Sequence, residues 1–479
     1  MTQPPTPNPF SAPGHTSRSC CNEMTRADLL RQSAAQLGAT AGAGLPVIES
    51  GMPAPAGTGL TRRSFVLRSA GTMLTIYGAM HFNLLDLNSY ARAAAPADPI
   101  FVSVFMEGGV DSLSVLAPVT DSKYRALRPT LALAPDAGTA FSEDPRLHWN
   151  PAAEAFSTLH SEGKLSVAPS VGYADADQSH FTSRHYWEVG DTSTREQTGW
   201  MGRYLDRVGS ADNPLQGLSL DYSLAPALAP KRVPVAAVSN PRSYNFDHRN
   251  VWGDVQDQMV EAFEQIGSAH AGSSDAGLRS AATAAAMSAK LRRQLLPFAG
   301  DGDSPGVTSP VTYPSGNDDF PEKLQFLAAM IQLGLPLRCV ALRAAGGYDT
   351  HDNQGENFAG DLKLTADSLL AFQRDLEARG IADRVIVQVW SEFGRRPQEN
   401  GGQGTDHGAA GMSMLMGTQV RGQMIGEFTG LDRLDEDDNM RPSVDYRSLY
   451  SGVLGQWLQH DPAAIIPGAA KYPAPALIR

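Results

Sequence analysis

Four turns of this sequence place carboxylate or imidazole side chains directly after a β-type apolar run or a glycine-rich bend. Ligands at the carboxyl ends of neighbouring parallel strands meet at one edge of an open α/β sheet. Carboxylate oxygens and imidazole nitrogens together bind divalent ions, here Zn²⁺, Mn²⁺, Ca²⁺ or Mg²⁺, and one or two ions can share such a set. The sequence therefore predicts a hydrolytic metal site whose candidate ligands are Asp111, Asp349, His351, Glu392, Asp406 and His407.

Each of these turns also has a purely structural interpretation. The Asp349-Thr-His351 turn is a common capping arrangement, and Glu392 could pair with Arg395 or Arg396. The metal hypothesis depends on all four turns occurring in one α/β domain.

A second group of residues could act on a substrate. Ser179 precedes a predicted helix, where the positive end of the helix dipole favours an anion and could activate a nucleophile. The alternative is that Ser179 only caps this helix. His180 could bind an anion or a metal ion, or pack in the core, and Arg395 could contact an oxyanion, as could Arg184 and Arg396. The candidate catalytic residues are thus Ser179, His180 and Arg395.

Composition and missing motifs exclude several classes of function. The net charge of −12 argues against nucleic acid as a partner. Three cysteines are too few for a disulfide scaffold. The Gly-x-Ser-x-Gly elbow, the phosphate-loop motif and a Gly-x-Gly-x-x-Gly turn after the first strand are absent. Nucleotide and nicotinamide chemistry are therefore disfavoured.

The N-terminal segment has the pattern of an export signal. Residues 1–60 are rich in Pro, Gly, Ala, Ser and Thr, and we interpret them as disordered or as a misassigned start. Residues 61–95 contain Arg62-Arg63, a mildly apolar stretch and an Ala-rich exit, which predicts a twin-arginine signal peptide. A surface helix that happens to carry two arginines is the alternative. His81, Asn83 and Asp86 interrupt the apolar stretch, so no permanent membrane span is expected. The predicted location is periplasmic or secreted, with the twin-arginine machinery as a partner.

Residues 96–479 alternate apolar runs with helical patterns. Strands are expected at 99–106, 165–171, around Cys339, at 385–390 and at 412–416, with a possible one at 234–238. Helices are expected at 152–159, from Ser179, at 200–208, 251–296, 324–333, 362–379 and 446–458, and a mobile linker at 297–318. This order predicts a single α/β domain, a doubly wound, mostly parallel sheet between helices.

Several spaced motifs together resemble one bacterial family. They include Phe-Met-Glu-Gly-Gly-Val-Asp111-Ser, Gln-Ser179-His-Phe, Tyr-Asp349-Thr-His351-Asp-Asn, Ser-Glu392-Phe-Gly-Arg-Arg and Gly-Thr-Asp406-His-Gly. The set resembles the exported family catalogued as domain of unknown function 1501, from about residue 97 to the C-terminus. That family is similar to the alkaline phosphatase and sulfatase superfamily, which implies an alkaline-phosphatase-like fold and a one- or two-metal esterase site.

The resemblance also implies roles for individual residues. Asp111 matches the first-strand metal aspartate, and Ser179 matches the nucleophile at a helix start. Asp349 and His351 match an Asp-and-His metal pair, with a shorter spacing than usual. Glu392 stands where an Asp-His pair normally ends a strand, and Asp406 with His407 supplies the late histidine. Val110 and Ser112 depart from the usual Asn and Gly around the first aspartate.

Two functions from different classes follow. The first is an exported metal-dependent hydrolase that acts on an anionic phosphate or sulfate ester. The second is a cell-surface binding or assembly protein that keeps the fold without turnover. The distances among the candidate ligands discriminate between them, because a metal centre requires their side chains to converge.

Overall fold

The computed structural model describes residues 76–77, 98–244, 254–298 and 307–479. The predictions for residues 1–60 and for most of the 61–95 signal segment lie outside the described residues, as does the middle of the 297–318 linker. Within the described part of the chain, no helix combines the length and apolarity needed to cross a membrane.

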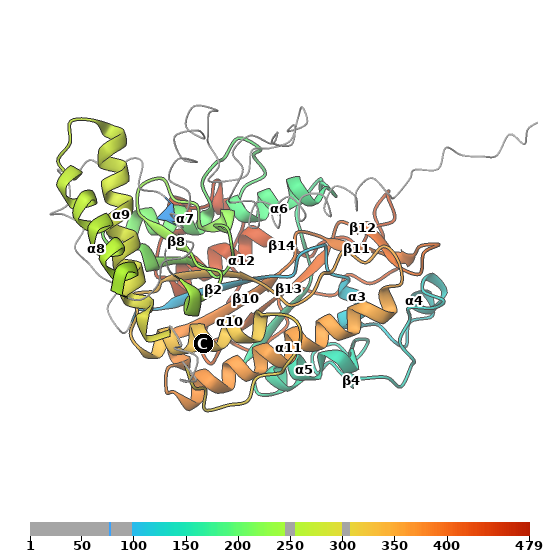
Figure 1. Cartoon of the computed structure of the whole chain (residues 1–479). Helices are drawn as coiled ribbons and strands as arrows, with labels where there is room; N and C mark the ends of the chain where they lie inside the picture. The colour runs from blue at the N-terminus through green and yellow to red at the C-terminus, as the bar shows by residue number, and fades with distance from the viewer. Residues whose placement is uncertain (1–75, 78–97, 245–253, 299–306) are drawn as a thin grey trace, which may run out of the picture. The chain divides into compact units, whose positions relative to one another are not determined.

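A central sheet organises the described chain (Figure 1). Within the described residues its strand order is β1-β8-β7-β9-β2-β10-β13-β6-β14. The bounds are β1 Ile76–Tyr77, β8 Val235–Ala237, β7 Gly217–Ser219, β9 Cys339–Arg343, β2 Ile100–Phe105, β10 Val385–Trp390, β13 Gly411–Met416, β6 Leu165–Gly172 and β14 Val444–Asp445. Neighbours from β8 to β10 pair in parallel, as do β14 and β6, whereas β1 and β13 run against their neighbours.

The central strands are apolar because both of their faces are buried. All six residues of β2 are buried, and its side chains alternate between two cores. Val102 and Val104 pack with one core, whereas Phe101 and Phe105 pack with the other. This alternation is the period of two that a strand imposes on its side chains.

Helices cover both faces of the sheet (Figure 1). One core includes side chains of α5 (Glu154–Ser161), α10 (Phe320–Gln332) and α11 (Gln354–Ala378). The other core includes side chains of α6 (His180–Val189), α7 (Trp200–Val208) and α12 (Tyr446–Gly452). The predicted α/β architecture with a mostly parallel sheet is therefore confirmed.

Some element boundaries differ from the prediction. The single helix expected over 251–296 is two helices, α8 (Asp254–His270) and α9 (Ala276–Leu295). The break has a local cause, because the Asp275 side chain accepts a hydrogen bond from the Leu278 N–H and starts a new helix. The strand expected at 412–416 exists as β13 but pairs antiparallel with β10.

Two smaller sheets flank the central one. β11 (Gly394–Glu399) and β12 (Thr405–Gly408) form an antiparallel hairpin that pairs Arg395 with His407. The other small sheet is β3 (Leu116–Ala117), β5 (His148–Trp149) and β4 (Thr139–Ala140), near the short helices α3 (Ser112–Val115) and α4 (Ser122–Leu127). The hairpin matters for the site because it carries three of the candidate residues, Arg395, Asp406 and His407.

Candidate metal centre

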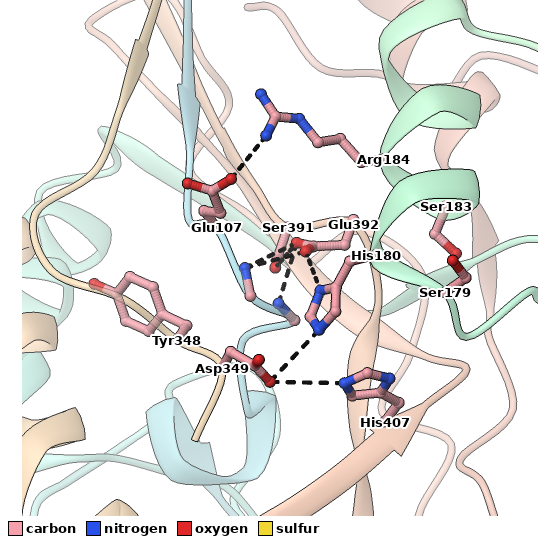
Figure 2. Close-up of polar contacts among 12 residues, drawn as sticks. Glu107, Ser179, His180, Ser183, Arg184, Tyr348, Asp349, Ser391, Glu392 and His407 are labelled. Carbon is pink, nitrogen blue, oxygen red and sulfur yellow. Dashed lines mark hydrogen bonds and ion pairs between the residues drawn. The ribbon is translucent and has the colours of Figure 1, made fainter. Parts of the chain in front are cut away.

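The candidate residues meet beyond the carboxyl ends of the central parallel strands. The turns after β2, β9 and β10 lie together there, joined by the first turn of α6 and by the β11–β12 hairpin (Figure 2). Parallel strands direct their carboxyl ends to one edge of the sheet, which is where ligands bind in open α/β folds. The strand topology therefore brings these turns to one edge of the sheet, whatever side chains they carry.

Asp349 lies at the centre of the cluster. Its Oδ1 is 3.1 Å from His351 Nε2, 3.5 Å from His180 Nε2 and 3.6 Å from His407 Nε2. The same oxygen accepts a hydrogen bond from the Arg395 guanidinium at 2.6 Å. Burial alone would raise the pKa of Asp349, but the three imidazoles and Arg395 hold it below its usual value. Asp349 is therefore an anion towards which three imidazole nitrogens point.

The outer nitrogen of each imidazole has its own acceptor. His180 Nδ1 is 2.7 Å from Glu392 Oε1, and His407 Nδ1 is 2.7 Å from the carbonyl oxygen of Gln178. His351 Nδ1 is 3.2 Å from Asp406 Oδ1. An acceptor at Nδ1 places the proton there, so a neutral ring presents a bare Nε2. Metal-binding histidines in proteins show this arrangement of outer carboxylates and carbonyls.

The inner nitrogens of the three imidazoles lie close to one another and to Asp349. His351 Nε2 and His407 Nε2 are 3.0 Å apart. His180 Nε2 is buried and, within the described residues, makes no regular hydrogen bond, although Asp349 Oδ1 lies 3.5 Å away. When these nitrogens are unprotonated, their lone pairs face one another and a carboxylate, and a cation between them would stabilise this arrangement. Burial lowers the pKa of His180, but Asp349 and Glu392 raise it to about 9. The carboxylates around this ring therefore stabilise a positive charge in the cluster.

These atoms fit a divalent ion. In the described part of the chain, ligand atoms of His180, Asp349 and His407 lie within 4.8 Å of one another. His351 adds a third imidazole that contacts both Asp349 and His407. Three imidazole nitrogens with one carboxylate oxygen are a typical ligand set for Zn²⁺ and related ions, and suit Ca²⁺ or Mg²⁺ less, since those prefer oxygen.

Glu392, a predicted ligand, lies behind the cluster instead of in it. Its carboxylate accepts hydrogen bonds from the backbone N–H groups of Gly108 and Gly109, at 3.1 to 3.2 Å, and from Ser391 at 3.0 Å. Gly108 has φ of +120°, and a Cβ there would lie 2.2 Å from the Asp349 nitrogen. Glu392 therefore positions His180 and joins the β2 turn to the cluster, which the glycines allow to approach closely.

Asp111 and Asp406 also differ from the prediction. Asp111 is fully buried and binds the Arg128 guanidinium through both oxygens, at 2.5 and 2.9 Å. Ser114 and Gln354 donate to its Oδ2 at 2.6 Å each, so the carboxylate is already satisfied. Although burial raises the pKa of Asp111, Arg128 holds it below its usual value. Asp406 contacts His351 from outside the cluster and is half exposed.

Arg395 does not fit the predicted contact with a substrate oxyanion. Its side chain is fully buried, and it donates to the carbonyl oxygens of Gly109 and Thr405 at 2.7 Å and to that of Gly108. Its remaining strong contact is with Asp349. The guanidinium N–H groups are used within the chain, where they hold Asp349 and the hairpin in place. They are therefore not available to a substrate oxyanion.

Ser179 lies at the start of α6, as predicted. Its hydroxyl makes no capping hydrogen bond to the helix. Figure 2 shows Ser179 beside Ser183, on the opposite side of His180 from Asp349. The structure therefore brings together Asp349, His351 and His407 with His180, and leaves Ser179 outside their contacts.

Sequence reasoning missed the partners that hold these residues. Arg128 connects Asp111 to the hairpin by donating to the Pro397 carbonyl at 2.8 Å. Gln354 joins Asp111 to Thr405, to which its Oε1 is 2.7 Å away. Gln178 contacts His407 through its backbone carbonyl oxygen, and such a contact cannot be recognised from a pattern of side chains. For Arg128 the sequence offered a signal, because this arginine stands directly before a proline in the run Tyr124-Arg-Ala-Leu-Arg128-Pro129.

Fold and site together define a mixed α/β protein with a histidine-rich candidate metal centre at the carboxyl edge of its sheet. The chain belongs to the family described as "Protein of unknown function (DUF1501)", whose model matches residues 189–454, more than half of the chain. No curated protein matches the chain.

Solved structures show remote similarity. A protein in the alkaline phosphatase superfamily from Vibrio parahaemolyticus is 8% identical, with 83% of this chain and 77% of that chain covered and a TM-score of 0.32. The sulfatase PsFucS1 from Pseudoalteromonas sp. is 11% identical over 83% of this chain and 75% of that chain, with a TM-score of 0.35. The protein Ps i-CgsB is 10% identical over 79% and 77%, with a TM-score of 0.36.

Proposed function

We propose that this protein is an exported, metal-dependent hydrolase of phosphate or sulfate esters. The observation that supports this proposal most is the approach of three Nε2 atoms to Asp349 Oδ1, while each Nδ1 already faces an acceptor. A divalent ion bound there would supply a Lewis acid that polarises an ester oxygen. The nitrogen-rich ligand set favours Zn²⁺ or Mn²⁺ as that ion.

The charges around the cluster favour an anionic substrate. Three of the four proposed ligands are imidazoles, which are neutral when they bind a cation, and the Asp349 charge is shared with the buried Arg395 guanidinium. These four ligands would therefore neutralise little of a bound cation's charge. Glu392, buried behind His180, fixes the ring orientation, so the ligands need little rearrangement when substrate binds.

The attacking group is proposed to be Ser179 or a water molecule. Ser179 directly precedes the proposed ligand His180, at the N-terminus of α6. The second candidate function, a cell-surface binding or assembly protein, is favoured by one observation: Arg395, the expected oxyanion contact, is turned inward.

Metal removal and reloading test the proposal. Full-length protein stripped with a chelator should regain its ion from Zn²⁺ or Mn²⁺ and melt at a higher temperature. Saturation at about 1,000 times Kd stabilises the folded state by about 4 kcal/mol. The measurements are metal content, melting temperature and hydrolysis of p-nitrophenyl phosphate and p-nitrophenyl sulfate. Protein that takes up no ion and melts unchanged would contradict the metal centre.

The Ser179→Ala variant separates the candidate roles in the same assays. If Ser179 is the nucleophile, turnover should fall by several orders of magnitude with metal content intact. If it has no catalytic role, turnover should stay near that of the parent protein, and the melting temperature should change little because the hydroxyl makes no capping hydrogen bond. Full metal loading with no turnover by the parent protein, on either ester, would support the binding protein instead.

The export route rests on residues outside the described part of the chain. We propose that Arg62-Arg63 directs the precursor to the twin-arginine machinery and that the protein acts in the periplasm or outside the cell. Replacing both arginines with lysine should retain the precursor in the cytoplasm, as measured by cell fractionation. Normal export of the double variant would contradict this proposal.

A further inference from the structure

Asn400 directly follows β11, in the turn that leads to β12, and its side-chain amide makes four hydrogen bonds. Its Nδ2 donates to Asp406 Oδ1 and to the His351 carbonyl oxygen, both at 3.0 Å. Its Oδ1 accepts from the N–H groups of Gly402 and Gly404, at 2.9 and 3.1 Å. An amide offers two N–H donors and an oxygen with two lone pairs, so this side chain is fully used. It connects the hairpin turn to the turn after β9.

The chemistry of these partners fixes the orientation of the Asn400 amide. Backbone N–H groups can only donate, so they require Oδ1, whereas a carboxylate and a carbonyl oxygen can only accept, so they require Nδ2. Reversing the amide would break all four hydrogen bonds. The Nδ2 donor therefore faces Asp406.

Asp406 is the outer partner of a proposed ligand. Its Oδ1 is 3.2 Å from His351 Nδ1, and the same oxygen accepts the hydrogen bond from Asn400. The Asp406 side chain is 48% exposed, so burial alone does not fix its orientation. Glu392, which contacts His180 in the same way, is only 1% exposed and is held by backbone N–H groups. Asn400 thus gives Asp406 the fixed orientation that burial gives Glu392.

The hairpin turn is also joined to the turn after β9 through the backbone. Three hydrogen bonds run from N–H to carbonyl oxygen, from Asn353 to Gly402 at 3.0 Å, from Gln354 to Gln403 at 3.0 Å and from Thr405 to Thr350 at 3.1 Å. These bonds do not involve the Asn400 side chain. Its replacement is therefore expected to release Asp406 while the two turns stay together.

We propose that Asn400 is a positioning residue of the metal centre, which holds the Asp406 carboxylate against His351 Nδ1 and so keeps the His351 ring directed at the ion. This inference rests on the proposed function, because it requires an ion between the imidazoles. His351 is one of three imidazoles among the four proposed ligands, and imidazole suits Zn²⁺, whereas carboxylate oxygen suits Mn²⁺. Asn400 therefore determines how strongly the centre prefers Zn²⁺ to Mn²⁺.

Titration of metal-stripped, full-length protein with Zn²⁺ and with Mn²⁺ tests this role. Asn400→Ala should lower the Zn²⁺ affinity by about 10-fold, the lower end of the range for loss of an outer partner, and the Mn²⁺ affinity by less. Asn400→Asp still accepts from both glycine N–H groups but cannot donate to Asp406. Its added charge acts on both ions alike, so the ratio of Zn²⁺ to Mn²⁺ affinity should fall in this variant too.

The possible failures are distinguishable. An unchanged affinity ratio in either variant, beside a parent protein that binds Zn²⁺, overturns the role of Asn400 alone. A parent protein that binds neither ion overturns the proposed function and this inference with it.

Two further variants separate positioning from a general loss of stability. Asn439→Ala is the matched control, because Asn439 also donates to a carboxylate, that of Asp435 at 3.1 Å, in a turn that supplies no proposed ligand. Its affinities for both ions should equal those of the parent protein. In an Asp406→Ala background, Asn400→Ala should lower the Zn²⁺ affinity little further, because the carboxylate through which it acts is already absent. Losses that add in the double variant, or an equal loss in Asn439→Ala, overturn the proposal.

Discussion

Replacing Asp349 with asparagine is expected to abolish metal binding and turnover together while the fold persists. Asparagine has the same shape, and its oxygen can still accept the hydrogen bond from Arg395. It lacks the negative charge that three Nε2 atoms face. Loss of an outer partner weakens metal affinity by about 10- to 100-fold, so loss of the central anion should exceed about 100-fold. Isothermal titration with Zn²⁺ measures this.

Asp352→Asn is the control for Asp349→Asn. Asp352 lies in the same turn but is exposed. Its replacement makes the same change in net charge, so a general electrostatic effect would appear in both variants. An Asp349→Asn protein that binds Zn²⁺ as tightly as the Asp352→Asn protein would show that Asp349 is not a ligand.

Replacing Asp111 with alanine is expected to destabilise the protein without removing a ligand from the metal centre. The change leaves the Arg128 guanidinium buried without its carboxylate. Breaking a buried ion pair in this way costs about 3–5 kcal/mol. The midpoint of urea unfolding should therefore fall sharply, while the folded protein keeps its metal stoichiometry.

The exposed Lys123–Asp432 pair provides the comparison for Asp111. Its atoms are as close as 2.6 Å, but water screens them. Asp432→Ala should leave the unfolding midpoint nearly unchanged. If Asp111→Ala instead removed the ion at little cost in stability, the sequence-based assignment of Asp111 as a ligand would be right and the structural assignment wrong.

The fold could be predicted because the amino-acid pattern of the central strands reflects their burial on both faces. Runs such as Ile100–Phe105 and Val385–Trp390 are apolar on both faces, which a parallel sheet between helices requires. The direction of β13 could not be predicted in this way, since an apolar run has the same pattern whichever way it pairs. The break between α8 and α9 was signalled by Gly272 and Asp275, which the alanine-rich composition outweighed.

The sequence identified the turns that form the site, but not which of their residues would bind an ion and which would support a ligand. Asp349, His351 and His407 came from the pattern, because acid and imidazole follow strands or glycines. Whether a carboxylate binds an ion or supports a ligand depends on long-range partners. Glu392 meets the Gly108 N–H, and Asp111 meets Arg128, by the path of the backbone in space. No local spacing encodes those encounters.

The four proposed ligands come from three segments that are far apart in the sequence: the start of α6, the turn after β9, and β12. Their atoms converge only when the sheet, α6 and the hairpin have all formed, so an unfolded chain has no pre-assembled site to fill. Ion uptake therefore accompanies or follows the folding of these three segments. A precursor that matures before it crosses a membrane would take its ion from the compartment in which it was synthesised, and the metal supply there would decide which ion the protein carries outside.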